Sequence, residues 1–217
     1  GSCGGWRGGP EKGKYDRELQ AAEARYEPHY ERFAQMDFAT LASDPDAQKL
    51  GSSLFAGYCT TCHGSDARGA TGYPNLTDDD WIWGDNEVAI TTTIRQGRNS
   101  IMPTLSAALG GDVGINNMVN YVRSLSGAVE ADAAAMSAQP LFTALCSACH
   151  MPDGGGNQLL GGPNLTDETT LYGSSPEAIR TTIVQGRNGV MPPHGEFLGD
   201  KRTKILAAYV YRLSNAK

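Results

Sequence analysis

Two short motifs of cysteine and histidine contain the residues whose types and spacing indicate a particular chemistry most specifically. The pattern C-x-x-C-H occurs at residues 59–63 and again at residues 146–150. Two thiols at this spacing form thioether bonds to the vinyl groups of a haem, and the adjacent imidazole becomes a ligand of its iron. The motifs therefore predict two covalently attached c-type haems, with attachment through Cys59, Cys62, Cys146 and Cys149 and iron ligation by His63 and His150.

The same four cysteines allow two other interpretations. They would fit two disulfide bridges of a secreted protein, or one zinc ion held by two C-x-x-C pairs. Neither alternative gives a role to the histidine that follows each pair, so covalent haem is favoured. The fifth cysteine, Cys3, is predicted to be a bystander in an N-terminal tail, with lipid attachment as the alternative.

An internal repeat organises the rest of the chain. Residues 74–78 (PNLTD) recur as residues 163–167, and the segment QGRN at residues 96–99 recurs at residues 185–188. The offset between matching positions stays at 87 to 89 residues, which indicates two copies of one unit. The sequence thus predicts an N-terminal helical extension at 1–45, a first domain at 46–126, a linker at 127–138 and a second domain at 139–217.

The elements that must position these motifs are predicted to be helices, so the fold class is all-α. The apolar spacing and the cap residues place helices at 49–58, 86–97, 112–125, 139–145, 175–186 and 200–213. A further helix in the extension is expected to end at Pro28, since proline lacks the backbone donor that a helix interior uses. No segment is predicted to be a strand.

A second iron ligand for each site is predicted from the repeat. Met102 and Met191 are each followed by proline and lie at matching places, 39 residues after His63 and 41 residues after His150. We therefore expect His63 to pair with Met102 and His150 with Met191. The other methionines have no counterpart in the opposite copy. The competing ligands are His194 for the second iron and His29 for the first, with surface histidine as the plainer interpretation.

Further residues are candidates for contacts around the haem. A ligating histidine normally donates its other ring N–H to an acceptor, and the carbonyls of Pro74 and Pro163 are placed for this. Propionate contacts are proposed for two arginines and two aromatic residues at matching positions, with ordinary surface and packing roles as the alternative. These residues are Arg98, Arg187, Trp83 and Tyr172.

Charge and hydropathy exclude some classes of function. The net charge is −6, with 24 acidic and 18 basic residues and no basic run, which argues against a nucleic-acid partner. An acidic surface favours docking of a basic protein. No stretch approaches the roughly 18 consecutive apolar residues of a membrane helix, so membrane attachment is expected only through an anchor missing from this sequence.

Taken together, these motifs resemble the dihaem cytochrome c subunit, subunit III, of cbb3-type cytochrome c oxidase. The resemblance is closest at residues 62–69, 75–81 and 186–192, and it extends to residues 5–6, 15–18 and 26–28. It implies two tandem class I cytochrome c domains at the periplasmic face of a bacterial inner membrane. It departs at Met151, which stands where the first copy has Gly64.

The resemblance also implies a function and partners. The protein would take electrons from a soluble donor cytochrome c and relay them toward the oxidase catalytic subunit, beside a monohaem cytochrome subunit, without being an enzyme itself. Iron held by histidine and methionine has no open position for substrate, which agrees with a carrier. The alternatives are a free periplasmic dihaem carrier, a cytochrome subunit of a dehydrogenase and, with least support, a dihaem peroxidase.

Overall fold

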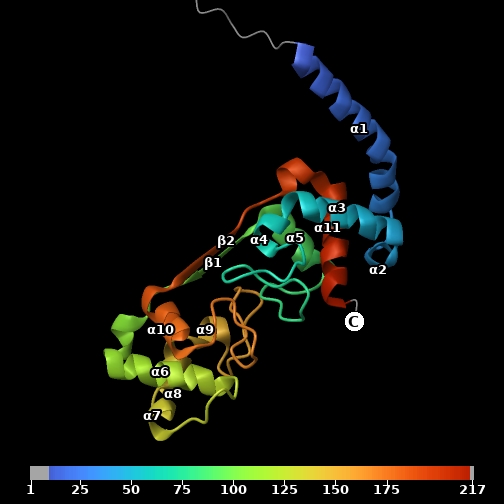
Figure 1. The fold of residues 1–217 in the computed structure, drawn as a ribbon. Coiled ribbons are helices and arrows are strands. Elements are labelled where there is room, and N and C mark those ends of the chain that lie inside the picture. The colour runs from blue at the N-terminus through green and yellow to red at the C-terminus, as the bar shows by residue number, and fades with distance from the viewer. Residues whose placement is uncertain (1–9, 216–217) are drawn as a thin grey trace, which may run out of the picture.

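The computed structural model describes residues 10–215, which form two helical lobes joined by a narrow ribbon (Figure 1). The first lobe contains α1 (Pro10–Ala34), α2 (Phe38–Ser43), α3 (Pro45–Tyr58), α4 (Thr60–His63), α5 (Glu87–Gln96) and α11 (Gly195–Asn215). The second lobe contains a 3-10 turn (Ser106–Leu109), α6 (Asp112–Leu125), α7 (Ala133–Met136), α8 (Gln139–Leu145), α9 (Ser147–His150) and α10 (Pro176–Gln185). The predicted all-α class is confirmed.

The ribbon consists of two short antiparallel strands that the sequence analysis missed. Strand β1 (Arg98–Met102) pairs with β2 (Arg187–Met191), and Ser100 lies opposite Gly189 at the centre. These two strands are equivalent segments of the two repeats, so the register relates the repeats by an approximate two-fold axis. Exposure alternates along both segments in the structure, but a period-2 pattern over only five residues is too short to identify a strand from the sequence.

Because both strands run between the lobes, each repeat places its terminal helix on the other repeat. Helix α11 packs against α3 and α5, whereas α6 packs against α8 and α10. The ring of Phe55 contacts Tyr209 at a centroid distance of 5.6 Å, and the equivalent pair Phe142 and Tyr121 lies at 5.3 Å. The packed lobes have thus exchanged the terminal helices of the two repeats.

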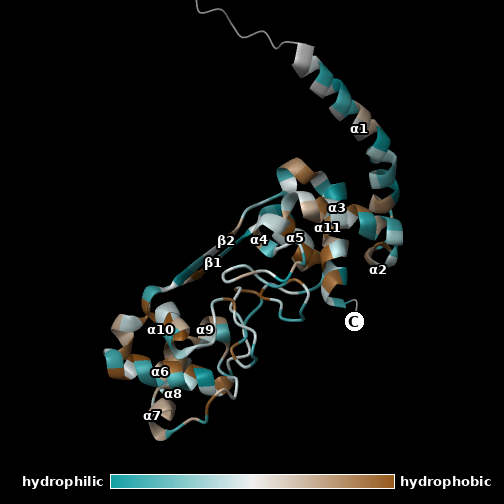
Figure 2. Cartoon of the chain, in the orientation of Figure 1, coloured by the Kyte–Doolittle hydropathy of each residue, from teal (hydrophilic) through white to brown (hydrophobic). Residues whose placement is uncertain are grey.

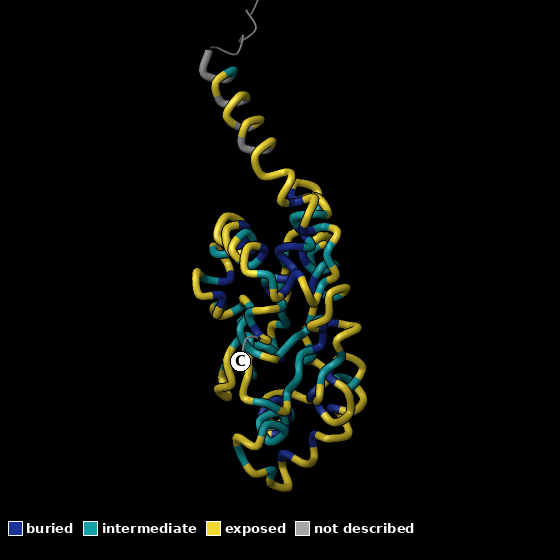
Figure 3. Tube along the Cα trace, turned by 90° about the vertical axis from the view of Figure 1, so that its right-hand side faces the viewer, coloured by how far each residue is buried: buried dark blue, intermediate teal, exposed yellow. Residues whose placement is uncertain are grey.

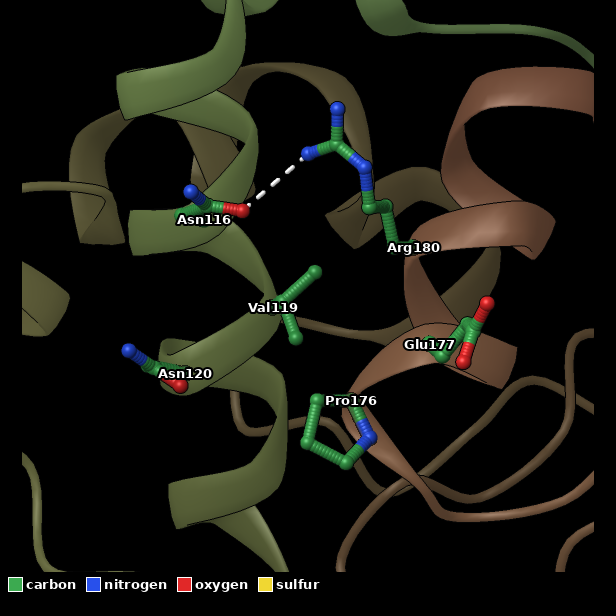
Figure 4. Close-up of a pocket in the computed structure, with 6 residues that line it drawn as sticks. All are labelled: Asn116, Val119, Asn120, Pro176, Glu177 and Arg180. Carbon is green, nitrogen blue, oxygen red and sulfur yellow. Dashed lines mark hydrogen bonds between the residues drawn. The ribbon is translucent and has the colours of Figure 1, made fainter.

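The contact between α6 and α10 can be followed in Figure 4. Arg180 of α10 donates a hydrogen bond of 3.1 Å to Asn116 of α6, and its guanidinium also lies 2.6 Å from the carboxylate of Asp112. Val119 and Pro176 face each other across the shallow groove between the two helices. Polar and apolar contacts therefore both join the two repeats within the second lobe.

Two buried clusters form the cores of the lobes. The first is centred on side chains from α1, α2, α3 and α11, and its most buried large members are Phe33, Leu41, Ile205 and Leu206. The second lies among α6, α8 and α10 and is centred on Met118, Phe142 and Ile183. Brown segments in both lobes of Figure 2 show the helix faces that supply these residues.

Local signals explain most of the helix boundaries. Asn86 caps α5 and Ser175 caps α10, each through its side chain, and Gly97 and Gly186 end these helices as predicted. Pro28 does not end α1, which corrects the prediction, because α1 continues to Ala34. The Lys204 ammonium on α11 donates to the carbonyl of Ala34, so a tertiary contact holds the end of the helix that proline would otherwise interrupt.

Helix α1 is held to the first lobe by contacts of its C-terminal half. Lys201 on α11 forms ion pairs with Glu27 and Glu31, and the Arg202 guanidinium lies 4.9 Å from the ring of Tyr30. The N-terminal half projects away from the lobe and is largely exposed where described (Figure 3). Across residues 10–215, no helix has the length and apolar character needed to cross a membrane.

A glycine at the crossing of α3 and α11 provides a direct test of the close packing between these two helices. A Cβ atom on Gly51 would lie 2.5 Å from Cβ of Tyr209, so we expect Gly51→Ala to destabilise the fold by about 1–3 kcal/mol. Gly57, also in α3, has no atom near its added Cβ, and Gly57→Ala should stabilise by about 0.5–1 kcal/mol. Denaturant unfolding of both variants measures the difference, and equal effects would contradict the crossing.

Candidate haem-attachment sites

The first C-x-x-C-H motif lies where α3 turns sharply into α4. Cys59 caps the C-terminus of α3, and its carbonyl accepts the backbone N–H of His63 at 2.9 Å. This single turn brings both thiols and the imidazole to one side of the chain. The His63 side chain is buried, and its Nδ1 donates a hydrogen bond of 3.0 Å to the Pro74 carbonyl, as predicted. That bond fixes the ring and leaves Nε2 free to bind a metal.

The second motif has the same geometry in the other lobe. Cys146 caps the C-terminus of α8, and its carbonyl accepts the backbone N–H of His150 at 2.9 Å. The His150 Nδ1 donates to the Pro163 carbonyl at 2.9 Å. Burial is the main cause that lowers the pKa of both His63 and His150, so both imidazoles are held neutral, the form that ligates iron. The repeat thus produces two equivalent histidine sites.

All four motif cysteines are free thiols, and each pair has one partly buried and one exposed member. Burial, with the neighbouring cysteine as a smaller cause, raises the pKa of Cys59 and Cys146 to about 11. Within residues 10–215 no group of three or more His, Cys, Asp or Glu side chains is arranged to hold a metal ion. These observations give no support to the disulfide and zinc alternatives.

Each of the two methionines lies in the lobe that contains the histidine of the other repeat, which is the opposite of the expected arrangement. Met191 packs against the core of the first lobe, together with Cys59, and Met102 packs against the core of the second lobe, together with Cys146. The cause is the ribbon, since β1 and β2 each end on a methionine after crossing to the other lobe. The structure therefore places Met191 with the His63 lobe and Met102 with the His150 lobe.

Each strand also begins on one of the two predicted arginines. Arg98 donates from Nε to the Thr93 hydroxyl at 2.8 Å, and its guanidinium lies 4.4 Å from the centre of the Trp83 ring. Arg187 makes the equivalent bond to Thr182 at 3.0 Å and lies 4.2 Å from the Tyr172 ring. In the ribbon register, Arg98 is opposite Met191 and Arg187 is opposite Met102. Each arginine is thus beside the methionine of its own lobe.

The remaining candidate residues lie elsewhere. His194 belongs to the first lobe, because its backbone N–H bonds to the carbonyl of Ile94 and its charge contributes to lowering the pKa of His63. Its expected competition for the second iron is therefore not supported. His29 is exposed on α1. Cys3 lies outside the described residues.

Met151 adopts a backbone conformation that normally requires glycine. Its φ of 62° and ψ of 158° match the φ of 78° and ψ of 159° at Gly64, the equivalent residue of the first repeat. A side chain in this region costs about 1–3 kcal/mol. The second lobe therefore retains the turn after its histidine despite the substitution, because the flanking motif and loop contacts hold it.

An aspartate in the first loop has an unusual ionisation that the sequence analysis did not anticipate. Burial, followed by the negative charges of Asp167, Asp78 and Asp79, raises the pKa of Asp80 to about 6. Asp80 and Asp167 belong to different repeats, so the interaction indicates that the loops after the two motifs approach each other. The only sequence signal was the run of three aspartates at residues 78–80.

Stability should consequently fall as the pH rises through the range in which Asp80 titrates. The folded chain retains a proton that an unfolded aspartate releases near pH 4, so between about pH 4 and 6 the free energy of unfolding decreases. Because the group is half exposed, we expect a loss of about 1 kcal/mol. Urea unfolding at both ends of this range should show the loss in the wild type and in Asp85→Asn, an exposed control. Asp80→Asn should lack it, and a pH-independent difference between the two variants would contradict the assignment.

Two helical lobes, each with a C-x-x-C-H turn and a buried histidine, define a c-type cytochrome. The sequence pattern of the family "Cytochrome C oxidase, cbb3-type, subunit III" matches residues 46–122 and again residues 133–210. The chain therefore belongs to this family.

Individual relatives agree with this placement. The cbb3-type cytochrome c oxidase subunit CcoP of Rubrivivax gelatinosus is 41% identical over 93% of this chain and 66% of its own length. Subunit FixP of Azorhizobium caulinodans is 38% identical over 86% of this chain and 68% of its own length. Subunit CcoP of Cereibacter sphaeroides is 32% identical over the whole chain and 80% of its own length. The chain thus spans about two thirds of the first two of these relatives.

Proposed function

We propose that this chain is an electron carrier that binds two haem c groups covalently and relays electrons to the catalytic subunit of a cbb3-type oxidase. The observation that carries the proposal is the pair of buried histidines, each directly after two free thiols and each oriented by a proline carbonyl. Free thiols suit thioether attachment, and a neutral imidazole with Nε2 available suits iron. When bound, each haem supplies one-electron redox chemistry.

Within this proposal, each lobe would close its iron site with a methionine from the other repeat. His63 and Met191 would serve the first haem, and His150 and Met102 the second, because the core packing brings these residues into common lobes. Methionine raises the reduction potential relative to a second histidine and leaves no position open to substrate. Arg98 and Arg187 keep guanidinium N–H groups beyond those bonded to the threonines, and these would bind propionates.

The names of the relatives, which describe subunits of cbb3-type cytochrome c oxidase, support the setting that we propose. We place the chain at the periplasmic face of the bacterial inner membrane, held by an anchor outside this sequence. Its partners would be the catalytic subunit, the monohaem cytochrome subunit and a soluble donor cytochrome c. The net charge of −6 favours a donor with a basic docking face. The chain itself would have no catalytic activity.

A reconstitution experiment tests the proposal. The haem-loaded chain, reduced by a basic cytochrome c, is mixed with a cbb3-type oxidase that lacks this subunit. We expect oxygen consumption to be restored, and the oxidised chain to show two low-spin irons with a methionine charge-transfer band. A high-spin ferric signal, or turnover of peroxide by the chain alone, would favour a dihaem peroxidase instead. Failure to restore oxygen consumption with both irons low-spin would favour a free carrier.

A further inference from the structure

The loops that follow the two C-x-x-C-H motifs meet between the lobes, as Figure 1 shows for the segments after α4 and after α9. The Gln158 side chain donates a hydrogen bond of 2.9 Å to the Trp81 carbonyl, and the Gly72 backbone N–H donates one of 2.8 Å to the Leu171 carbonyl. Each bond joins the first repeat to the second. The loops that hold the proximal histidines are thus in direct contact.

An aromatic ring from each repeat reaches a glycine of the other at this interface. A Cβ atom on Gly161 would lie 2.2 Å from the Trp83 indole, so the six-membered part of the ring is packed against the Gly161 backbone. The equivalent pair is Tyr172 and Gly72, where the added Cβ would lie 3.5 Å from the phenol ring. Each of these glycines lies two residues before a proline, Pro163 or Pro74, whose carbonyl orients a histidine. The crossed pairs therefore follow the same two-fold relation as the ribbon.

The Trp83 contact reaches the second motif itself. Gly162 is packed so closely against the Cys149 carbonyl that an added Cβ would lie 1.9 Å from it. The dipeptide at 161–162 is thus held between the Trp83 ring and the backbone next to His150. On the other side, Arg98 stacks on Trp83 and lies opposite Met191 in the ribbon. Trp83 consequently connects the ligand-bearing segments of both lobes.

We propose that Trp83 and Tyr172 are positioning residues that lock the two haem-binding loops together and so fix the separation of the two irons. Trp83 has the larger effect, because its ring is in tighter contact than that of Tyr172. The inference rests on the proposed function, in which the two bound haems would exchange one electron, one iron going from Fe(II) to Fe(III) as the other goes from Fe(III) to Fe(II). A rigid contact between the loops would hold the two irons at one separation, so that electron exchange would occur over a single distance.

Matched glycine variants separate this contact from ordinary backbone strain. Gly161 and Gly72 both have positive φ, 68° and 86°, so alanine is strained at either position, but only Gly161→Ala also overlaps a ring. We expect Gly161→Ala to lower the unfolding midpoint of the haem-loaded chain more than Gly72→Ala does. In a Trp83→Ala background this difference should vanish, which is the non-additivity expected of contacting residues.

The rate of electron exchange between the two haems, followed after partial photoreduction, gives the second readout. Trp83→Phe keeps a ring beneath Arg98 but removes the atoms that touch Gly161, and it should slow the exchange several-fold while leaving both low-spin spectra intact. Tyr172→Phe keeps its ring and should exchange like the wild type. Two results together would overturn the inference. The exchange rate would be unchanged in both Trp83→Phe and Gly161→Ala, and the effects of Gly161→Ala and Trp83→Ala on the unfolding midpoint would be additive. A wild-type chain that binds two haems but shows no exchange would instead count against the proposed function.

Discussion

Replacing Met191 with alanine is expected to open the iron site built on His63 and to leave the site built on His150 closed. Met191 lies with Cys59 in the first lobe, although it belongs to the repeat that contains His150. In the proposed site, loss of the Met191 side chain would remove one of the residues that hold the iron, so the affected iron should become high-spin and its reduction potential should change. The oxidised spectrum should therefore show one high-spin and one low-spin haem.

A chain with a single haem identifies which iron is affected. Cys59→Ala with Cys62→Ala removes the first attachment site and leaves the second haem alone. In this background we expect Met102→Ala to produce a high-spin spectrum and Met191→Ala to have no effect on spin state. The reverse result would restore the pairing within each repeat, in which Met191 serves His150.

Alanine at Gly97 is expected to be among the most destabilising small substitutions in the chain. Gly97 has φ of 71° and ψ of −177°, a conformation that is nearly exclusive to glycine, and an added Cβ would lie 2.3 Å from the Met191 carbonyl oxygen. Strain and overlap with backbone together should cost about 3–5 kcal/mol. The overlap should also displace Met191, so the methionine charge-transfer band of one haem should weaken.

Gly199 provides the control for this substitution. Its φ of 68° and ψ of 174° are nearly those of Gly97, but no atom lies near its added Cβ. Gly199→Ala should therefore cost only the strain, about 1–3 kcal/mol, and should leave the spectrum unchanged. Chemical unfolding and absorption spectra of both variants make the comparison. Equal destabilisation with unaltered spectra would show that β2 does not press on the end of α5.

The sequence was sufficient for most of the helices and for the motifs around which the candidate sites are built. The C-x-x-C-H motifs, the cap residues Asn86 and Ser175 and the final apolar helices are local signals, and the structure contains the predicted helices. The hydrogen bonds from the two histidines to Pro74 and Pro163 are also present. These features were accessible because each depends on a few residues close together in the chain or on comparison of one repeat with the other.

The exchange of helices and methionines was not accessible, for a physical reason. Phe55 contacts Tyr209, but Tyr121 would offer it the same ring from the same kind of helix, so the apolar pattern does not distinguish the two arrangements. The ribbon determines which of the two arrangements forms, because an extended segment of five residues spans roughly 16 Å and carries the chain out of its own lobe. The alternating pattern of so short a segment was too weak to predict that path.

The ribbon also determines the order in which the two lobes are completed during synthesis. The second lobe is continuous from the end of β1 to the start of β2, so all of its helices are available once α10 has emerged. The first lobe begins earlier but requires α11, which follows the whole of the second lobe in the chain. The motif at residues 59–63 is therefore translated first and enclosed last. Until the whole of the second lobe has been synthesised, helix α3 of the first lobe lacks the packing of α11, a vectorial asymmetry between two otherwise equivalent sites.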